Sequence, residues 1–463
     1  MRWLLLLVLG LSSAASADEA TRDREALEIL DGVLKADTSH GNESLALGPI
    51  AARLRAAGIP CVLLESAPGR GNLVARLRGS GKKKPLMLLA HVDVVPTDGQ
   101  PWTSAPFAPT ERDGYLVARG IGDDKSMVAA FTAEVLELQR SKTKLSRDVI
   151  LALTAGEETG GVEGVKWLLA QPKERTLGFS DAAIALNEGG YLVLDRDEKR
   201  ILSVGLGAAE KTYQSYGLTV KGPGGHSSVP NARANPVTTL ARALVRLGEL
   251  RFPAHVIPAT RDALTFRAGV EAPALAAALR RTLASGRPTA EDEKLLATIP
   301  TIDSILCTTC VATMLSGSPQ ANVLPTSVSA TVNCRVMPDE TREATRATLV
   351  RAVDDSTVVV TPLEDMGEGG ASPVRGEVPD AVRAVAKRMG TEVAEFPVMG
   401  TGASDSRHLR KTGILAYGIS AWPMSMEDGQ AGHGAHGADE RRPTRWHADG
   451  MRFVDQVVRE LTK

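Results

Sequence analysis

Helical and strand-like patterns of apolar residues alternate along the chain up to about residue 207. Residues 126–139 carry apolar side chains at helical spacing and predict a strong amphipathic helix. Residues 85–95 and 149–155 are almost continuously apolar, as is typical of strands buried on both faces. Further helices are predicted over 26–34, 45–57 and 162–170, and further strands over 61–65, 72–77, 182–186 and 201–206. This alternation predicts an α/β domain in which helices cover both faces of a mixed central sheet.

The pattern changes after residue 207, where strands begin to alternate apolar and polar positions. Residues 212–220 and 327–336 alternate in the way expected of half-exposed strands. The same region holds predicted strands over 305–315 and 357–361, predicted helices over 235–250 and 341–353, and an Ala- and Arg-rich helical insertion over 254–299. We therefore predict a smaller α+β domain over 208–363 that interrupts the α/β domain, whose two parts span 18–207 and 364–463.

The N-terminal residues have the pattern of a signal peptide rather than of a folded element. Arg2 is positively charged, residues 3–11 form an almost continuous apolar run, and Ala15-Ser16-Ala17 has the small side chains of a cleavage site. The apolar run is about half of the ~20 residues that a membrane-spanning helix needs, and an uncleaved anchor is the alternative. We expect residues 1–17 to be removed and the mature chain to be exported, either to a periplasm or as a secreted protein.

Composition narrows the class of protein further. The chain has 463 residues, of which 43% are hydrophobic, enough to bury the cores of two domains. The 54 Lys and Arg residues are balanced by 55 Asp and Glu residues, so the formal net charge is −1. This balance gives no electrostatic reason to expect nucleic acid or an anionic membrane surface as a partner.

Four cysteines are too few for a disulfide scaffold. Cys307 and Cys310 have CxxC spacing, but on the predicted strand their Cα atoms lie roughly 10 Å apart and their side chains point to opposite faces. A disulfide needs Cα atoms less than ~7 Å apart, so a redox pair is disfavoured. Cys334 lies on the next predicted strand, and whether it, Cys61 or either of the others is paired stays open.

Short motifs with metal-binding or acid–base side chains stand near the ends of predicted elements, where open α/β sheets bind ligands. They are His91-Val92-Asp93, Gly122-Asp123-Asp124-Lys125, Glu157-Glu158, Asn187-Glu188-Gly189-Gly190 and His436-Gly437-Ala438-Asp439-Glu440. Each is weak alone, because an HxD pair is usually an ordinary exposed pair and adjacent acids before a helix are as often an N-terminal cap. Together they supply two histidines and several carboxylates, the ligand types of paired divalent metals such as zinc.

The order of these motifs, HxD, GxxDDK, EE, NEGG and HGxxE, resembles the M20 family of co-catalytic zinc metallopeptidases, which includes carboxypeptidases, dipeptidases and aminoacylases. The resemblance covers essentially the whole mature chain, including GGHSS at residues 224–228 in the insert. The NEGG segment, TGASDSRH at residues 401–408 and His436-Gly437 are most similar to carboxypeptidase S and to secreted N-acyl-amino-acid hydrolases. Asp439 stands where those relatives usually have Asn, and Ser126 where Gly is usual, which bears only on the subgroup.

The resemblance implies two zinc ions bridged by one carboxylate. The implied ligands are Asp123 for both ions, His91 and Glu188 for one ion, and Glu158 and His436 for the other. His433 competes with His436 for this role, and His436 is preferred because the residues that follow it fit the family pattern. Family members also hold the Asp123–Asp124 peptide in the cis form.

The resemblance also implies roles beside the metals. Asp93 orients His91, and Glu157 is the general base that takes a proton from the water between the ions. The inserted domain of the family carries a dimer surface and substrate contacts, so a homodimer is expected. His226 is similar to the histidine that polarises the scissile carbonyl, often in the partner subunit's active site.

Three further residues are expected to contact the substrate: Asn322 and Arg335, which match family positions, and Arg407. Their donors suit a carboxylate, whereas without the resemblance Arg335 would be read as a solvated surface charge and His226 as an ordinary loop histidine.

These expectations describe an exported hydrolase with two zinc ions per subunit, for which cobalt or manganese can substitute. Its expected substrates are peptides or N-acyl amino acids, cleaved at the amide next to a free C-terminal carboxylate. The alternatives are a di-zinc dipeptidase or aminopeptidase and a non-catalytic metal- or peptide-binding homologue. The acyl group, the amino acid, the native metal and the direction of the reaction in vivo stay open.

Overall fold

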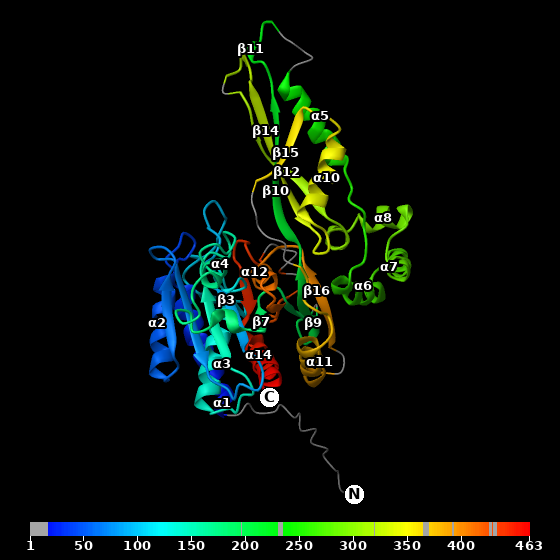
Figure 1. The fold of residues 1–463 in the computed structure, drawn as a ribbon. Helices are drawn as coiled ribbons and strands as arrows, with labels where there is room; N and C mark the ends of the chain where they lie inside the picture. The colour runs from blue at the N-terminus through cyan, green and yellow to red at the C-terminus, as the bar shows by residue number, and fades with distance from the viewer. Residues whose placement is uncertain are drawn as a thin grey trace.

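The computed structural model describes residues 17–463 except 196, 230–234, 319, 364–369, 391–392, 426–427 and 429–432. Of the expected signal peptide, all but Ala17, the first residue of helix α1 (Ala17–Leu34), lies outside the described residues. The described chain forms a larger part around a nine-stranded sheet and a smaller part, around a four-stranded sheet, that stands above it (Figure 1).

The nine-stranded sheet positions most of the candidate ligands. Its order is β1 (Cys61–Glu65), β2 (Gly71–Leu77), β6 (Val149–Thr154), β3 (Leu86–His91), β7 (Ile184–Asn187), β17 (Leu415–Gly418), β9 (Ile201–Glu210) and β16 (Ala394–Gly400), and β8 (Tyr191–Leu194) pairs with β9. Strands β6, β3, β7 and β17 run parallel, so their carboxyl ends meet at one edge. Ligand sites of open α/β sheets lie at such an edge.

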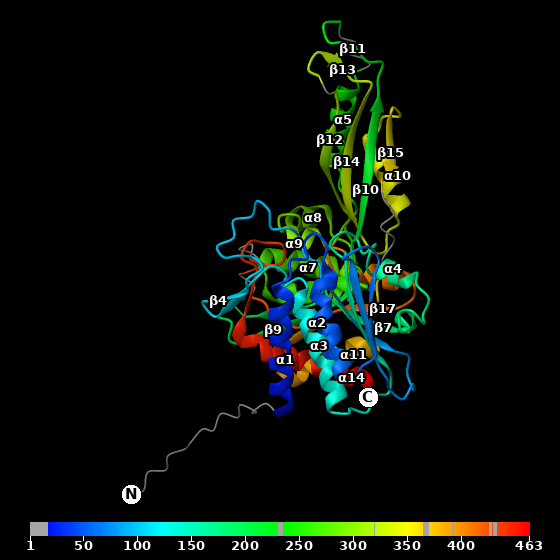
Figure 2. The same ribbon diagram turned by 90° about the vertical axis from the view of Figure 1, so that its left-hand side faces the viewer.

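Helices cover both faces of this sheet, as predicted. Along β3, Leu86, Leu88 and Ala90 face one core, and Met87 and Leu89 face the other. The first core is closed by α1, α2 (Glu43–Ala56), α3 (Lys125–Arg140), α11 (Glu377–Met389) and α14 (His447–Thr462). The second is closed by α4 (Val165–Leu169) and α12 (Ser406–Lys411). Figure 2 shows α1, α2 and α3 side by side over one face. The predicted α/β class is confirmed.

The smaller sheet has the order β12 (Thr309–Ser316), β14 (Ser327–Val336), β10 (Thr212–Lys221) and β15 (Val358–Pro362). Along β14, alternate residues from Val328 to Val336 are buried against α5 (Pro236–Glu249) and α10 (Arg342–Val353). Only Lys211 separates β9 of the large sheet from β10 of the small one. Sheet membership therefore changes near residue 208, and the domain limits 208 and 363 stay predictions.

The Ala- and Arg-rich insertion forms helices α6 (Pro258–Val270), α7 (Pro273–Ser285), α8 (Ala290–Leu296) and α9 (Pro300–Asp303). Helix α6 packs against β16 of the large sheet, while its Leu264 and Ala268 belong to the core of the smaller part. The remaining elements are two small sheets, β18 (Arg441–Pro443)–β5 (Tyr115–Val117)–β4 (Thr110–Arg112) and β11 (Gly225–His226)–β13 (Val323–Leu324), and the short 3-10 helices η1 (Phe179–Asp181) and η2 (Thr444–Trp446).

The predicted strand over 305–315 was placed too early. Leu306 donates its N–H to the carbonyl of Asp303, so the residues after α9 form a turn and β12 begins only at Thr309. Cys307 therefore lies buried before the strand. Cys310 faces Cys334 across β12 and β14, with Cα atoms 4.1 Å apart, and the two form a disulfide. This pairing answers the question that the sequence left open.

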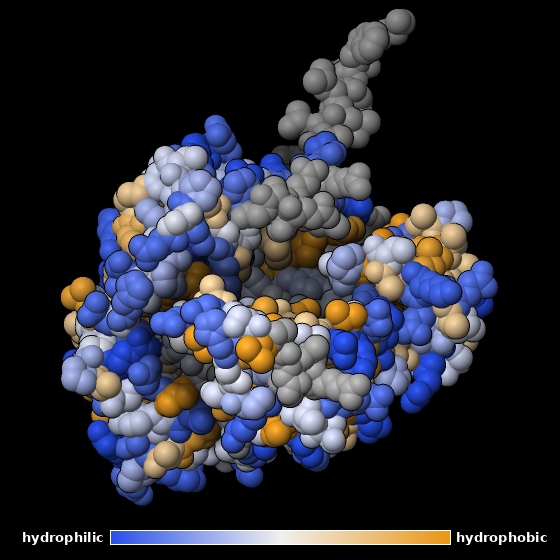
Figure 3. Space-filling view, turned by 90° about the horizontal axis from the view of Figure 1, so that it is seen from above, coloured by the Kyte–Doolittle hydropathy of each residue, from blue (hydrophilic) through white to orange (hydrophobic). Residues whose placement is uncertain are grey.

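None of the helices among the described residues is long and apolar enough to span a membrane. Seen from the side of the smaller part, the surface is mostly hydrophilic, with hydrophobic residues in small separate groups, and it is hollowed near the middle (Figure 3).

Removing the disulfide is expected to destabilise the protein. The two cysteines are 24 residues apart, and closing a loop of that length stabilises a fold by about 3 kcal/mol in the chain-entropy model. A Cys310→Ser, Cys334→Ser double variant should lose about 2–4 kcal/mol of unfolding free energy in denaturant titration. Cys61→Ser is the matched control. Thiol labelling of the unreduced, denatured protein should detect Cys61 and Cys307 alone, and labelling of Cys310 would contradict the pairing.

Candidate metal centre

Five side chains from separate segments converge at the carboxyl edge of the large sheet. His91 ends β3, Glu158 follows β6, and Glu188 directly follows β7. Asp123 lies in the loop before α3, and His436 lies in the loop before β18. They form two groups, His91–Asp123–Glu188 and Asp123–Glu158–His436, with potential ligand atoms in each group within 4.8 Å of one another.

Asp123 belongs to both groups and presents one oxygen to each. Its Oδ1 lies 2.9 Å from Nε2 of His91, which is itself 3.7 Å from Oε1 of Glu188. Its Oδ2 lies 3.2 Å from Nε2 of His436, which is 3.1 Å from Oε1 of Glu158. A carboxylate placed in this way can bridge two ions. The Asp123–Asp124 peptide is cis, as the resemblance implies.

Asp93 joins one histidine to the loop that carries both glutamates. The backbone N–H groups of Glu157 and Glu158 donate to its carboxylate at 3.1 and 3.0 Å. Nδ1 of His91 lies 2.9 Å from the Asp93 carbonyl and 3.5 Å from its carboxylate. If Nδ1 of His91 carries the proton and donates it to Asp93, Nε2 is free to bind a metal ion. Partners such as Asp93 usually orient metal-binding histidines in this way.

The electrostatics of the cluster favour a cation. Burial and the charge of Asp123 raise the pKa of Glu188, while burial and nearby carboxylates raise the pKa of Glu157. Hydrogen bonds to Asp123 and Glu158 raise the pKa of His436 to about 10. Converging carboxylates with imidazole nitrogens between them fit two divalent ions, because bound cations neutralise the crowded negative charge and accept both oxygen and nitrogen ligands.

A cavity of about 480 Å³ opens beside the second group. Its lining is Glu157, Glu158, Thr159, Gly160, Tyr213, Arg335, Gly402, Ala403, Arg407 and His436. Arg335, from β14, stacks its guanidinium 4.8 Å from the ring centre of Tyr213. Burial, together with the charge of Arg407, lowers the pKa of Arg335. The two guanidinium groups thus line the same cavity as Glu157 and Glu158.

His226 and Asn322 lie elsewhere in the chain. The β11–β13 ribbon places them together, and the N–H of Ser227 donates to the carbonyl of Asn322 at 3.0 Å. Figures 1 and 2 show this ribbon at the tip of the smaller part, far from the large sheet. Within one chain, the structure thus brings Arg335 and Arg407 to the cavity beside the candidate ligands but leaves His226 and Asn322 apart. His433 points its Nδ1 to the Ala438 carbonyl instead of joining either group.

The sequence reasoning missed several supporting residues. Asn72, fully buried on β2, accepts from the N–H of Ala155 at 3.1 Å and donates to the carbonyl of Glu163 at 2.9 Å. It clamps both ends of the segment that carries Glu157 and Glu158. His408 contacts the Gly160 carbonyl of the same segment at 3.0 Å. A polar residue at the first position of the predicted strand 72–77 was the only sequence signal for Asn72.

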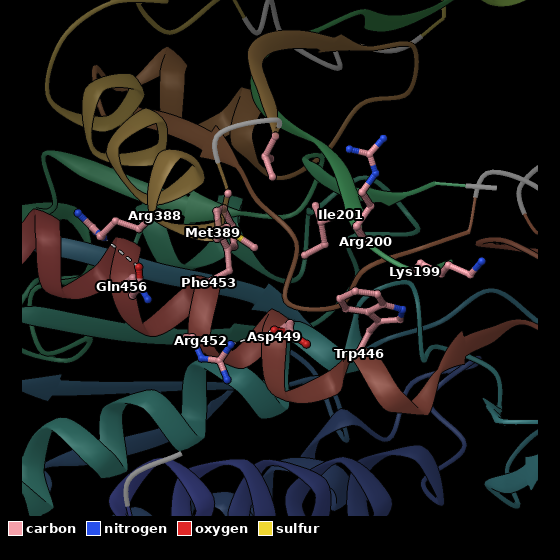
Figure 4. A pocket seen from close by; sticks show the side chains of 12 residues that line it. Lys199, Arg200, Ile201, Arg388, Met389, Trp446, Asp449, Arg452, Phe453 and Gln456 are labelled. Atoms are coloured by element: carbon pink, nitrogen blue, oxygen red, sulfur yellow. Dashed lines mark hydrogen bonds and ion pairs between the residues drawn. The ribbon is translucent and has the colours of Figure 1, made fainter. Parts of the chain in front are cut away.

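A second cavity, of about 590 Å³, shares no lining residue with the cavity beside the ligands. It lies between the start of β9, the end of α11 and helix α14, with Trp446, Met389 and Phe453 among its apolar walls (Figure 4). Arg388 pairs there with Glu460, and Arg452 with Asp449. None of the candidate ligands lines this cavity, so it is not part of the candidate centre.

Solved structures share this fold over nearly the whole chain. An M20 family metallo-carboxypeptidase of Sulfolobus solfataricus superposes with a TM-score of 0.66 at 18% identity, covering 96% of this chain and 99% of the other. Human carnosine dipeptidase 1 superposes with a TM-score of 0.65 at 15% identity, covering 96% and 97%. At these identities the similarity establishes the fold alone.

Similarity in sequence extends over most of the chain. A probable carboxypeptidase S-like protein of Dictyostelium discoideum is 28% identical over 387 residues, which are 82% of this chain and 72% of the relative. An N-fatty-acyl-amino acid synthase/hydrolase of Mus musculus is 24% identical over 394 residues, 81% and 74% of the two chains. The profile of peptidase family M20/M25/M40 matches residues 87–460. The chain therefore belongs to the M20/M25/M40 peptidase family of metallopeptidases and related amidohydrolases.

Proposed function

We propose that this family member hydrolyses the amide bond next to a free C-terminal carboxylate, as a carboxypeptidase or an N-acyl-amino-acid hydrolase does. The observation that carries this proposal is the pair of guanidinium groups, Arg335 and Arg407, in the cavity beside the candidate metal ligands. Within the part of the chain that the structure describes, neither guanidinium makes an ion pair with a carboxylate. An arginine fork binds carboxylates in a bidentate manner, so this pair suits the carboxylate of a substrate.

The remaining lining favours the same end of the substrate. Apart from the candidate ligand Glu158, the only carboxylic acid among the described lining residues is Glu157, which lies beside the candidate metal groups. No other carboxylate among the described lining residues is available to pair with a free α-amine. An acylated or peptide-bonded nitrogen therefore fits this cavity better than the charged amine that an aminopeptidase recognises.

In this proposal, each group at the site has its own role in hydrolysis. Two divalent ions, when bound, would supply an activated water and polarise the carbonyl. Glu157 lines the cavity next to Glu158 and is placed to take a proton from the water and deliver it to the leaving nitrogen. Arg335 and Arg407 hold the carboxylate, and Asp93 holds the backbone of Glu157 and Glu158 in place. We propose zinc as the native metal, with cobalt or manganese as substitutes.

We further propose a homodimer in which His226 acts in the partner's cavity. Strand β12 is an edge of the smaller sheet, and its Val311, Met314 and Leu315 are exposed. Exposed apolar edge strands pair with other strands, so a second copy is the natural partner for β12. Because His226 lies far from its own chain's cavity, a role in polarising the carbonyl requires the partner subunit.

We also propose that the mature protein is exported. The Cys310–Cys334 disulfide supports this location, because disulfides persist in oxidising compartments and are rare in the cytosol. The pattern of residues 1–17 supports it independently.

Metal removal should abolish turnover. Chelation is expected to inactivate the protein, and added zinc, cobalt or manganese is expected to restore its activity.

Substitutions of the adjacent acids Glu157 and Glu158 should affect different quantities. Glu158→Gln should lower metal content by elemental analysis, since a ligand is lost. Glu157→Gln should retain both metals and lose most of kcat, since only proton transfer is impaired. The reverse pattern would show that the two roles are assigned backwards, and full activity in a metal-free sample would contradict the metal centre.

Arg335→Ala should weaken recognition of the substrate carboxylate. A charge-assisted hydrogen bond contributes about 1.5–3 kcal/mol, so kcat/KM for N-acyl amino acids should fall roughly 10- to 160-fold. The effect on the corresponding C-terminal amides should be much smaller. Arg351→Ala, an exposed arginine of helix α10, is the control and should leave both substrates unaffected. Equal cleavage of free acids and amides by the unmodified protein would refute the carboxylate anchor.

Subunit mixing tests the role of His226. His226→Ala and Glu157→Gln proteins should each be nearly inactive, and mixed dimers should regain part of the activity because one cavity then holds an intact Glu157 and the partner's intact His226. Activity is measured after subunit exchange has been verified by mass spectrometry of differently labelled chains. Exchange without recovery would place the site within one chain.

A further inference from the structure

Glu440 is fully buried between the loop that carries Asp123 and the loop that carries His436. Its Oε1 accepts from the N–H groups of Gly122 and Asp123 at 2.6 and 3.2 Å. Its Oε2 accepts from the N–H of Gly120 at 3.1 Å and from Nη1 of Arg119 at 2.8 Å. One carboxylate therefore holds the whole turn that leads into Asp123.

Arg119 and Gln100 extend this contact to the other loop. Arg119 is buried, its guanidinium lies 5.0 Å from the ring centre of Trp102, and its Nη1 donates to the Gly437 carbonyl at 3.2 Å. Nε2 of Gln100 donates to the His436 carbonyl at 3.0 Å, while its Oε1 accepts from Nη2 of Arg119. The two loops are thus tied to each other through side chains that bond to the backbone of Asp123 and His436 rather than to their side chains.

The two candidate metal groups differ in how many of their ligands lie on the two loops that these hydrogen bonds join. His91 ends a strand and Glu188 directly follows one, so the sheet fixes two of the three ligands of the first group. In the second group, Asp123 and His436 both come from loops, and the His436 side chain is 54% exposed. The contacts of Glu440, Arg119 and Gln100 therefore position two of the three candidate ligands of the second group, Asp123 and His436. In the first group they position only Asp123.

We infer that Glu440, together with Arg119 and Gln100, is a positioning unit that sets the spacing of Asp123 and His436 and thereby the affinity of the Asp123–Glu158–His436 group for its metal ion. This inference rests on the metal binding of the proposed function. Loss of such outer partners typically costs 10–100-fold in metal affinity.

Glu440→Gln is a sharp test because of where the donors lie. Both oxygens of Glu440 accept from N–H groups, so an amide nitrogen in either position places a donor against a donor. The substitution also removes the ion pair with the buried Arg119, while the volume of the side chain is kept. The turn and the loop are expected to shift rather than to repack around a cavity.

The experiment measures zinc affinity by competition with a chromophoric chelator in two backgrounds. Glu188→Gln leaves the second group intact, and His436→Ala leaves the first group intact. Adding Glu440→Gln should weaken zinc binding about 10- to 100-fold in the Glu188→Gln background and clearly less in the His436→Ala background. Unchanged affinity in the Glu188→Gln background, or an equal or larger loss in the His436→Ala background, overturns the inference. If the unmodified protein and both backgrounds bind no zinc, the proposed function fails as well, whereas zinc binding with unchanged affinity in the Glu188→Gln background contradicts the positioning role alone.

Two further variants separate positioning from general stability. Asp148 accepts from the N–H of Gly79 and from Arg76 and Arg78, the same kinds of partner as Glu440, but before β6 and away from the ligands. Asp148→Asn should lower the unfolding free energy without changing zinc affinity.

Gln100→Ala removes the hydrogen bond to the His436 carbonyl with little loss of buried structure. If Glu440→Gln does not fold, this variant can be measured in its place. It should weaken zinc binding several-fold in the Glu188→Gln background, and no change there counts against the inference.

Discussion

The crowding of carboxylates at one edge of the large sheet is the constraint on which the rest of the structure depends. Asp123, Glu158 and Glu188 approach the two histidines so closely that the donor atoms of each group lie within 4.8 Å of one another. Like charges at such distances are stable only with a cation or proton between them. The parallel strands β3, β6 and β7 bring part of this set together, because their carboxyl ends share an edge. The other members arrive on loops that must be held by side chains.

Those side chains form a second layer of buried polar contacts around the ligands. Asp93 holds the backbone of Glu157 and Glu158, Asn72 clamps the ends of the same segment, and Glu440 holds the turn before Asp123. Each of them satisfies backbone N–H groups that the loops would otherwise leave unpaired in a buried place. The same contacts that make these loops possible therefore also orient the candidate ligands and Glu157. The smaller part contributes Arg335, from β14, to the cavity beside these ligands.

Much of the fold and part of the candidate site were predictable from local patterns in the sequence. The bounds of β1 and β14 agree with the predicted strands, because their runs of apolar and alternating residues are bordered by turn residues. His91, Glu158 and Glu188 converge because they stand at or just after the ends of neighbouring parallel strands. The convergence of Asp123 and His436, which lie in loops, was implied only by the resemblance of the motif order to the family. Strand β16 and helix α14 were missed. Helix α14 carries a clear apolar face, so the signal was present, whereas β16 follows a helix and contains a proline that argues against a strand.

By itself, the sequence predicted the α/β class and the insertion of a smaller part, because the period of apolar positions is a local property. The five candidate ligands and Glu157 as the base beside them were implied by the resemblance that the motif order carries. Only the tertiary structure decided which cysteines pair, since Cys310 and Cys334 meet through strand register rather than through spacing. It also decided that Arg335 and Arg407 share a cavity while His226 and Asn322 lie at a distant tip. Asn72 and Glu440 act across 83 and 318 residues of chain, respectively, and no local pattern carries a contact over such a separation.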